Sequence, residues 1–550
     1  MSEKRYVIGV DFGTLSARAL LIDGKTGQEI ATAEMAYPHA VMDEMLPDGT
    51  KLPDRWALQH PADYTLCLRH VIAEVLREGE VAPEAVAGLG FDFTACTLLA
   101  LDAEGVPLCL REEYKGEPHA YAKLWKHHAA QGQADRINEV AKARGEAFLA
   151  LCGERVSSEW ELPKILQMLE EAPELYAKTA RFAEAADWLY ELLCGEICTG
   201  AAFAGYKNLW SAENGYPSDA FYRALDPRLA GIVGDKIPAR VRPVTDKGGV
   251  LHASGAALIG LPVGTPVALP MIDAHAAMPA VGAVAPGDLV MIIGTSACHI
   301  LHGAQTEPVP GICGCVREAV AEGVTTFEAG QSAVGDIFAW FVDHLLPQRY
   351  AEMAKVRGIS KHALLRELAS ALRVGESGLL ALDWWNGNRS ILDNADLSGM
   401  ILGMTLQTRP EEIYRALLEA TAFGSRVILE QYESGGLAVR NILAAGGIAR
   451  KDPLMMQIYA DVMGRELRVA DTAQAGALGS AIYAAVAGGI YPSLARAAEA
   501  LAAPCGTVYR PDPANHGVYS ALYREYRALH SYFGEGGSAV MERLRSIAGK

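Results

Sequence analysis

A repeated pair of apolar runs joined by a short polar turn constrains the fold of this chain more than any other feature. The first copy spans residues 6–23 (YVIGVDFGTLSARALLID) and the second spans residues 288–301 (DLVMIIGTSACHIL). The same dipeptide separates the two runs of each copy, as Gly13-Thr14 and Gly294-Thr295. Apolar β-forming runs on either side of a polar turn are typical of β-hairpins. We therefore expect two domains of similar core, each opening with its own hairpin, the first with its turn at residues 11–16.

The segments after each hairpin alternate between helical and strand-like patterns. Alanine, glutamate and leucine in helical rhythm predict helices over residues 61–76, 163–193, 410–430, 453–464 and 473–487. A short strand rich in alanine and glycine is predicted over residues 441–447. Such alternation is typical of an α/β architecture with partly parallel sheets. The turn-forming tripeptide 286–288 (PGD) places the boundary between two domains, at residues 1–284 and 285–550.

Charge and composition exclude several classes of protein. The 550 residues carry 49 Lys and Arg against 66 Asp and Glu, a formal net charge of −17. A field of this sign repels phosphate backbones and anionic lipid, so we expect no nucleic-acid and no membrane partner. The charge-free stretch 253–272 contains three prolines and three glycines, which favours buried strands with tight turns over a membrane-spanning helix.

The cysteines and the start of the chain indicate the compartment. The ten cysteines show no zinc-ribbon spacing, and the apolar run after the initial charged residues is too short for a secretory signal. We therefore expect a soluble, cytoplasmic protein with free, mostly buried thiols. The signatures of P-loop, dinucleotide-binding, nucleophile-elbow and zinc-protease sites are missing or broken. We interpret His127, His128 and His275 as ordinary surface or core histidines rather than metal ligands.

The turn of the first hairpin carries side chains suited to a phosphate and a cation. Asp11 stands at the end of an apolar run, with Gly13, Thr14 and Ser16 close behind. Backbone N–H groups of such a turn form a concave anion site, to which the two hydroxyls add donors. The Asp11 carboxylate offers the oxygen ligands that Mg²⁺ requires. An ordinary hairpin turn explains these residues too, but a second turn at residues 294–296, facing the same cleft, could grip a nucleotide triphosphate from the other side.

Two further positions suit nucleotide binding or phosphoryl transfer, but each also has an ordinary structural explanation. Gly446 and Gly447 follow an apolar strand, where the lack of a Cβ lets the backbone approach a flat ligand such as adenine. A strand-to-helix turn that needs a positive φ explains the same pair. Asp273 follows another strand and begins a run of small residues. It is either a helix N-cap or, if it faces the cleft, a general base for a substrate hydroxyl.

In this order and spacing, the motifs resemble those of the FGGY carbohydrate kinases, which belong to the actin-like ATPase superfamily. The resemblance rests on residues 11–14, 294–296 and 446–447, and on the segment 399–404 (GMILGM) followed by 412–419 (EIYRALLE). It covers nearly the whole chain. It implies two actin-like (ribonuclease H-like) domains around a central catalytic cleft, and the activity of an ATP-dependent sugar kinase.

Other segments are similar to the members of this family that phosphorylate L-ribulose. They are residues 92–97 (DFTACT), 124–129 (LWKHHA), 157–164 (SSEWELPK), 204–207 (AGYK), 383–390 (DWWNGNRS) and 445–451 (AGGIARK). Gln167 stands three residues after Lys164, where many FGGY kinases have a tryptophan. The similarity implies phosphorylation of L-ribulose on O5 to L-ribulose 5-phosphate, in L-arabinose catabolism.

The resemblance also implies roles for individual residues. Asp273 is expected to be the general base that takes the proton of the O5 hydroxyl, and Asp11 to hold Mg²⁺ directly or through water. The sugar is expected to contact Ala95 (through its backbone), Trp125, Lys207, Asp273 and Glu328. The phosphates of ATP are expected to lie against Thr14, Ser16, Gly294 and Thr295. The nucleoside is expected to lie near Gly335 and Gly447.

Two alternative functions stay open at this point. One is another FGGY kinase, acting on D-ribulose, D-xylulose or a pentitol. The other is a catalytically silent actin-like module that binds sugar or nucleotide, although the retention of Asp11, Asp273 and both phosphate turns argues against it. The oligomeric state is open as well, a homodimer included, because the helical region 515–545 could pack on the body of the protein or on a partner subunit.

Overall fold

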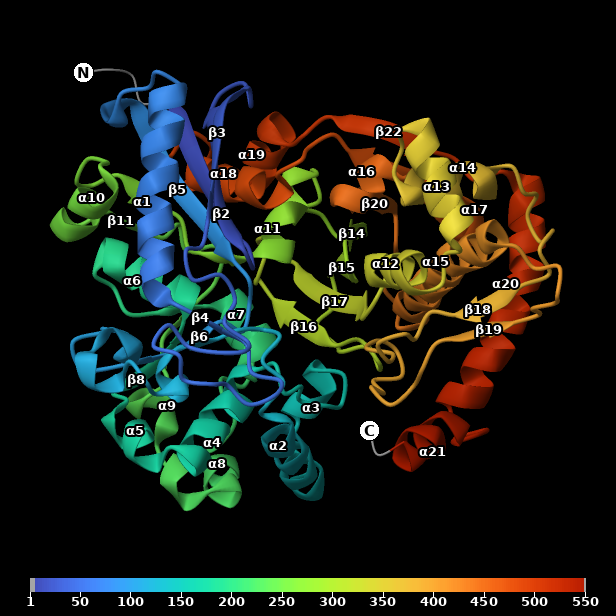
Figure 1. The fold of residues 1–550 in the computed structure, drawn as a ribbon. Coiled ribbons are helices and arrows are strands. Elements are labelled where there is room, and N and C mark those ends of the chain that lie inside the picture. The colour runs from blue at the N-terminus through green and yellow to red at the C-terminus, as the bar shows by residue number, and fades with distance from the viewer. Residues whose placement is uncertain (1–4, 549–550) are drawn as a thin grey trace.

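Two α/β halves, each built on its own mixed sheet, form the body of the molecule (Figure 1). The structure is a computed structural model that describes residues 5–548. The first sheet has the strand order β11-β12-β5-β1-β2-β3, with β13 also paired to β5. Its strands are β1 (Tyr6–Phe12), β2 (Ser16–Asp23), β3 (Glu29–Ala36), β5 (Val86–Phe93), β11 (Gly249–Val250), β12 (Pro266–Val267) and β13 (Met271–Ile272).

The second sheet repeats the connectivity of the first. Its strands are β14 (Asp288–Ile293), β15 (Ala297–Gly303), β16 (Gly314–Arg317), β17 (Thr325–Gln331), β20 (Asn441–Ala445), β21 (Leu467–Ala470) and β22 (Cys505–Tyr509). In both sheets the first strand of an antiparallel hairpin, β1-β2 or β14-β15, pairs on its other side with a parallel strand, β5 or β20. The prediction of two similar cores, each opening with a hairpin, is confirmed. The turn of the first hairpin is shorter than predicted, at residues 13–15, because β1 continues through Phe12.

The first sheet is covered on both faces, and one cover comes from the far end of the chain. Ile8, Val10 and Phe12 pack with helix α1 (Pro61–Glu78). Val7, on the opposite face of β1, packs with helix α18 (Ala475–Ala487) and helix α19 (Leu494–Leu501). Figure 1 shows α18, coloured orange-red, beside the blue strands. The division at residue 284 stays a prediction, and α18 joins the second half of the chain to the sheet of the first half.

Helix α18 approaches its neighbours so closely that side chains are excluded. A Cβ on Gly90 of β5 would lie 2.1 Å from the carbonyl oxygen of Ser480. A Cβ on Gly479 would lie 1.6 Å from the carbonyl oxygen of Ala276, in helix α11 (Asp273–Ala280). Glycine is therefore required at both positions, and backbone contact holds α18 to the first sheet and to α11.

A four-stranded sheet and several helices extend the first half below its main sheet (Figure 1). The sheet has the order β4-β7-β6-β8. These elements are β4 (Leu58–Gln59), β6 (Leu98–Leu101), β7 (Ala122–Lys123), β8 (Arg181–Glu184), α2 (Gln131–Arg144), α3 (Phe148–Leu151), α4 (Glu161–Glu171), α5 (Pro173–Lys178), α6 (Ala185–Cys194), α7 (Ala201–Lys207), α8 (Asp219–Leu225) and α9 (Ile232–Asp235). The prediction of helix throughout residues 163–193 was wrong, because β8 interrupts it by pairing with β6.

The other predicted elements are confirmed with one exception. Helix α15 (Pro410–Ser434), helix α17 (Pro453–Met463) and strand β20 lie where the sequence predicts a helix or a strand. The stretch 253–272 begins with helix α10 (Ala253–Ile259), so strands are found only in its second part. The remaining elements of the second half are α12 (Gly335–His344), α13 (Gln348–Arg357), α14 (Lys361–Ser370), β18 (Leu380–Leu382), β19 (Met400–Leu402), α16 (Gly447–Lys451), α20 (Pro513–Gly534) and α21 (Val540–Ile547).

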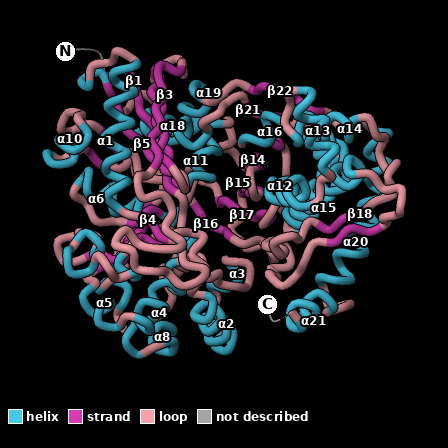
Figure 2. The backbone as a smooth tube through the Cα atoms, in the orientation of Figure 1, coloured by secondary structure: helices cyan, strands magenta, loops and turns pink. Residues whose placement is uncertain are grey.

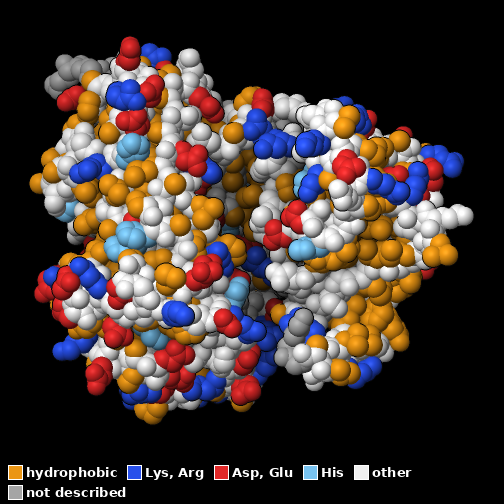
Figure 3. Space-filling model, in the orientation of Figure 1, with side chains coloured by type: hydrophobic (Ala, Val, Ile, Leu, Met, Phe, Trp, Pro, Cys, Tyr) orange, Lys and Arg blue, Asp and Glu red, His pale blue; other side chains and the backbone are white. Residues whose placement is uncertain are grey.

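The tube and surface views show how the two halves meet. In Figure 2 the strands of the two main sheets lie inside, and most helices lie outside them. Figure 3 shows that the surface is hollowed between the left and right halves. Within residues 5–548, none of the helices combines the length and the hydrophobicity that crossing a bilayer requires. All ten cysteines are free thiols, six of them buried, as predicted.

Candidate active site

Three carboxylates gather at one edge of the first sheet. Strands β1 and β5 are parallel, and Asp11 lies opposite Asp92 in their register. Strand β13 is also parallel to β5, and Asp273 follows its last residue and opens α11. The carboxyl ends of parallel strands meet at the same edge of a sheet, where α/β proteins bind ligands. The structure therefore brings Asp11 and Asp273 together and adds Asp92, for which no role was predicted.

Asp273 has the environment of a general base. Its Oδ1 accepts a hydrogen bond from the N–H of Ala274 (2.7 Å), and Ile272, not Asp273, occupies the N-cap position. Burial raises the pKa of Asp273 to about 7, and the negative charge of Asp11 adds to the effect. A carboxylate with a pKa near neutrality can both exist in its charged form and accept a proton efficiently.

Asp11 and Asp92 form a buried pair of carboxyl groups. Burial raises the pKa of Asp11, and it raises the pKa of Asp92 well above its ordinary value, with the charge of Asp11 as the next contribution. Oδ2 of Asp92 accepts a hydrogen bond from Ser480 of α18 (2.6 Å). Its Oδ1 has no hydrogen-bond partner within residues 5–548. Both carboxyl groups border Gly476, where an added Cβ would lie 3.3 Å from Oδ2 of Asp11 and 3.3 Å from Oδ1 of Asp92.

Glu328, in the middle of β17, is surrounded by basic side chains. Its Oε1 lies 2.9 Å from Arg389 and 3.7 Å from Lys207, and its Oε2 lies 2.9 Å from Nε2 of His275. Although burial raises the pKa of Glu328, Lys207, His275 and Arg389 together hold it well below the usual range. The charge of Glu328 in turn keeps the pKa of the buried Lys207 above its ordinary value. The structure thus places an anionic acceptor and cationic donors together, as recognition of several sugar hydroxyls requires.

The remaining predicted sugar contacts come from loops of the first half. Ala95 lies in the turn after β5, and it is half-buried. Trp125 is 39% exposed, and its Nε1–H donates to Oγ1 of Thr14 in the first hairpin turn (3.2 Å). This hydrogen bond joins Trp125, a predicted sugar contact, to Thr14, a predicted phosphate contact. The hydroxyl of Ser16, by contrast, donates to Oε1 of Glu34 on the neighbouring strand (2.8 Å).

The predicted nucleotide positions of the second half lie together. Strands β14 and β20 are parallel, so Gly294 and Gly446 follow neighbouring strand ends. The N–H of Gly335 donates to the carbonyl oxygen of Gly294 (3.1 Å), and the N–H of Val334 donates to that of Thr295 (2.7 Å). Gly446 has a φ of +101°, and a Cβ on it would lie 2.5 Å from the carbonyl oxygen of Ile293.

Gly447 is the open position of this group. A Cβ on Gly447 would have no heavy atom of the described chain within 4 Å, apart from its immediate neighbours. Its backbone therefore borders free space. Gly446 and Gly447 thus serve different purposes, because the first meets the demand of a tight turn and the second leaves the surface open.

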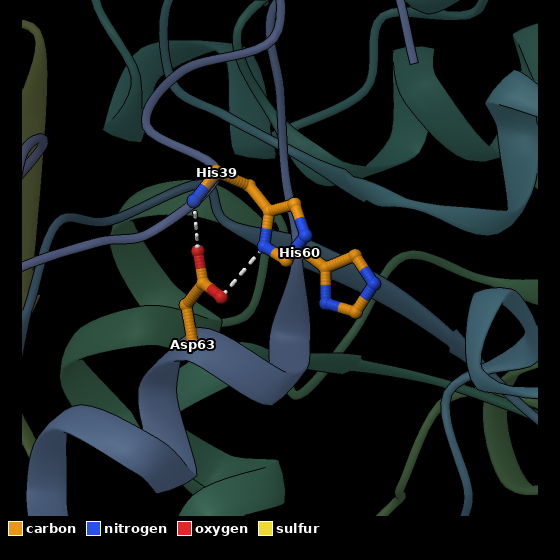
Figure 4. Close-up of side chains that lie close together, drawn as sticks. All are labelled: His39, His60 and Asp63. Carbon is orange, nitrogen blue, oxygen red and sulfur yellow. Dashed lines mark hydrogen bonds and ion pairs between the residues drawn. The ribbon is translucent and has the colours of Figure 1, made fainter. Parts of the chain in front are cut away.

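A second cluster of metal-ligating residue types lies at the start of α1. Figure 4 shows His39, His60 and Asp63, whose ligand atoms lie within 4.8 Å of one another. Oδ1 of Asp63 lies 2.8 Å from Nδ1 of His39, and Oδ2 accepts from the N–H of His39 (3.0 Å). Nδ1 of His60 accepts from the N–H of Ala62 (3.3 Å), and the two rings stack. Both oxygens of Asp63 therefore already have a partner, and the contacts hold the loop at His39 against α1.

Three residues of the site were not assigned a role from the sequence. Asp92 and Arg389 lie in segments that the family resemblance singled out, at residues 92–97 and 383–390, but neither was given a function. His275 was interpreted as an ordinary histidine, and it is a buried partner of Glu328. The only available signal for all three was their place next to motif residues, since the contacts themselves join distant parts of the chain.

The sequence of this chain matches the models of both domains of one known family. Residues 6–279 match the sequence model of the FGGY family of carbohydrate kinases, N-terminal domain, and residues 289–488 match that of its C-terminal domain. A ribulokinase of Halalkalibacterium halodurans is 49% identical over 548 residues, which are 99% of this chain and 97% of the relative. A ribulokinase of Bacillus licheniformis is 48% identical over 538 residues, 97% of each chain.

A solved structure shows the same architecture over both halves. The xylulose kinase from Rhodospirillum rubrum superposes with a TM-score of 0.79 at 25% sequence identity, covering 96% of this chain and 98% of the other. The expected fold, two actin-like domains, is thereby confirmed. The matches to both family domains, together with identity near one half over the full length of curated relatives, show that this chain belongs to the FGGY family of carbohydrate kinases.

Proposed function

We propose that the protein phosphorylates L-ribulose on O5, with ATP as the phosphoryl donor and L-ribulose 5-phosphate as the product. The relatives of about 48–49% identity are named as ribulokinases, and they match over nearly their whole length. The observation that carries the proposal within the structure is the buried Asp273 at the edge where Asp11 also lies. The activity belongs to the kinase class.

In the proposed reaction, Asp273 accepts the proton of the O5 hydroxyl. Phosphoryl transfer depends on alignment and charge neutralisation more than on covalent catalysis, so the base needs only to be positioned at the reacting hydroxyl. Glu328 accepts hydrogen bonds from sugar hydroxyls and Lys207 donates them, while Trp125 and the backbone of Ala95 border the pocket. The ion pairs of Glu328 support this role, because they hold its carboxylate in one orientation before the sugar arrives.

The nucleotide is proposed to lie between the two hairpin turns. Backbone N–H groups near Thr14, Gly294 and Thr295 are suited to the phosphates, and the open surface at Gly447 is suited to the nucleoside, with Gly335 beside Gly294. Ser16 is proposed to contribute to the phosphate site as well, which requires its hydroxyl to turn from Glu34.

A divalent cation fits the edge of the first sheet. The buried Oδ1 of Asp92 lacks a partner within residues 5–548, and Asp11 lies beside it in register. Asp11 is proposed to hold Mg²⁺, directly or through water. When bound, Mg²⁺ supplies charge neutralisation for the phosphates. We also propose a place for the enzyme in L-arabinose catabolism in the cytoplasm, and a homodimer as its assembly.

A coupled assay of ADP release tests the proposed function. The purified protein with Mg-ATP is offered L-ribulose, D-ribulose, L-xylulose, D-xylulose, ribitol and glycerol, and the product is identified by NMR. We expect the highest kcat/KM for L-ribulose, with phosphate on O5. A preference for xylulose or a polyol would keep the kinase class and the role of Asp273 but overturn the sugar assignment. Binding of sugar and ATP without any product would favour a silent module.

A further inference from the structure

We propose that Asp92 is a second carboxylate ligand of the divalent cation assigned to Asp11, and that Ser480 fixes the orientation of this ligand. The inference rests on the proposed function of the site as a Mg-ATP-dependent kinase. It gives a role to a side chain that is fully buried, carries no assigned function and lies at the junction of the first sheet with α18.

The register of the sheet places the two carboxyl groups side by side. Asp11 and Asp92 are directly opposite each other on adjacent parallel strands, so their side chains point to the same face. Both lie against the first turn of α18 at Gly476. Because Gly476 has no side chain, no Cβ occupies the space between the helix and the two carboxyl groups.

The hydrogen bonding of Asp92 is incomplete, as suits a side chain that can bind a cation. Its side chain is 0% exposed, and only Oδ2 has a partner, the hydroxyl of Ser480. Oδ1 is unpartnered within residues 5–548, and no ion pair in that part of the chain includes Asp92. The charged groups nearest to it, Asp11 and Asp273, have the same sign. Buried carboxylates are ordinarily paired with a cationic side chain or a metal ion.

The chemistry of this pair suits Mg²⁺ in a nucleotide site. Mg²⁺ prefers oxygen ligands and usually takes one or two protein carboxylates, with water and substrate phosphates completing its shell. Asp11 and Asp92 would supply two oxygens from neighbouring strands. Ser480 occupies the other oxygen of Asp92, so that Oδ1 is the atom turned towards the cation, as outer partners of metal ligands commonly arrange.

Binding of Mn²⁺, a paramagnetic substitute for Mg²⁺, tests the proposal without requiring turnover. The protein is saturated with ADP, and free Mn²⁺ is followed by electron paramagnetic resonance. We expect Asp92→Asn, which preserves the shape of the side chain, to weaken Mn²⁺ binding by at least the roughly 10- to 100-fold that loss of an outer partner of a metal ligand costs. Binding of ADP in the presence of EDTA should stay as in the wild type, because Asp92 does not contact the nucleotide in this proposal.

Asp187→Asn is a matched control. Asp187 is also a buried carboxylate with one oxygen bonded, to the N–H of Gly200, and with Oδ2 unpartnered in the described part of the chain. It belongs to α6 and not to the edge that holds Asp11. Asp187→Asn should therefore bind Mn²⁺ as the wild type does. An equal loss in both variants would overturn the proposal, since the loss would then follow from any buried carboxylate.

The melting temperature and a second variant test the same cation site. Mg²⁺ should raise the melting temperature of the ADP-bound wild type, and this increment should shrink in Asp92→Asn. If Asp92→Asn does not fold, Ser480→Ala is used, and it should weaken Mn²⁺ binding severalfold; unchanged binding would overturn the proposal. Wild-type Mn²⁺ affinity in Asp92→Asn would do the same. Failure of the sugar assay alongside weakened Mn²⁺ binding would instead count against the proposed substrate, leaving the cation site supported.

Discussion

Asp273 combines burial with a position at the end of a strand, and we propose it as the general base. We predict that Asp273→Asn lowers kcat by about 10²–10⁴-fold, the usual contribution of a general base. Binding of ATP, measured by calorimetry, should change little, because the substitution preserves the shape of the side chain. A variant with near-normal kcat would refute the assignment of the base.

The raised pKa of Asp273 predicts a pH dependence of the reaction. Only the ionised carboxylate can accept the O5 proton, and its pKa is raised to about 7. We therefore expect kcat/KM for the sugar to fall as the pH is lowered through about 7, approaching a tenfold loss per pH unit. A profile from pH 5 to 9 measures this. The residual activity of Asp273→Asn should lack the acidic limb, and an acidic limb retained by that variant would contradict the prediction.

Glu328 is predicted to matter for stability as well as for the sugar. Glu328→Gln leaves the buried Lys207 and the adjacent Arg389 without their carboxylate, and removal of one partner of a buried ion pair costs about 3–5 kcal/mol. We expect the free energy of unfolding in urea to fall by that order. Glu499→Gln, which breaks the exposed pair with Arg496, should produce no measurable change. Equal stability of the two variants would contradict the importance of the Glu328 cluster.

At the scale of residues, the sequence predicted the functional residues that lie in motifs and missed those that are recognisable only by their tertiary contacts. Asp11, Asp273 and the glycines after β14 and β20 are recognisable because each follows a short apolar run. Arg389 forms an ion pair with Glu328 from a distant segment, and no pattern near either residue in the sequence predicts this pair. The roles predicted for Ala95, Trp125 and the phosphate-binding residues remain predictions, although the structure brings Trp125 and Thr14 into contact.

At the scale of elements, the packing of α18 makes a sharp prediction. Gly479→Ala would place a Cβ 1.6 Å from the carbonyl oxygen of Ala276, so α18 and α11 must separate. We expect a loss of unfolding free energy of about 1–3 kcal/mol or more, as in other overpacked interiors. Gly517→Ala, at an exposed position of α20 with free space around it, should be neutral or slightly stabilising. Denaturant titration distinguishes the two, and equal stability would refute the close contact.

The hairpins and the long helices were predicted because the residues within each segment specify them. The hairpins at residues 6–23 and 288–301 each consist of two apolar runs joined by a short polar turn, and α15 and α17 keep helical spacing throughout. The stretch 163–193 has the composition of a helix, but Pro173 starts a new helix and residues 181–184 join a sheet. Pairing with β6 overrides the helical composition there, and that pairing depends on the tertiary fold.

At the scale of the whole molecule, the exposure of the cysteines predicts the reactivity of the folded protein. Cys505 is the one exposed thiol, while the other nine are buried or half-buried. We expect about one equivalent of fast reaction with Ellman's reagent in the native protein and ten after denaturation. Cys505→Ser should abolish the fast phase. A fast phase of several thiols, or one that persists in this variant, would contradict the described packing.

The presence of two similar cores was predicted from the sequence, but the packing of α18 on the first sheet was not. Two similar hairpins in the sequence indicate two similar cores, and both sheets confirm this. The sequence gives no sign that α18 belongs against β1 and β5, because that contact joins the two ends of the chain. Small residues along α18 indicate only that it packs closely, and not which partner it meets.

The crossing of α18 has a consequence for how the protein is made. Val7, Leu20 and Ile22 find their apolar neighbours only when residues 475–501 leave the ribosome. At 5–20 residues per second, one face of the first sheet waits for roughly 20–100 s during synthesis. Nascent chains that stop before residue 475 must keep that face uncovered or shielded by a chaperone. A gene fragment ending at residue 284 therefore encodes a sheet that lacks the helices covering its second face.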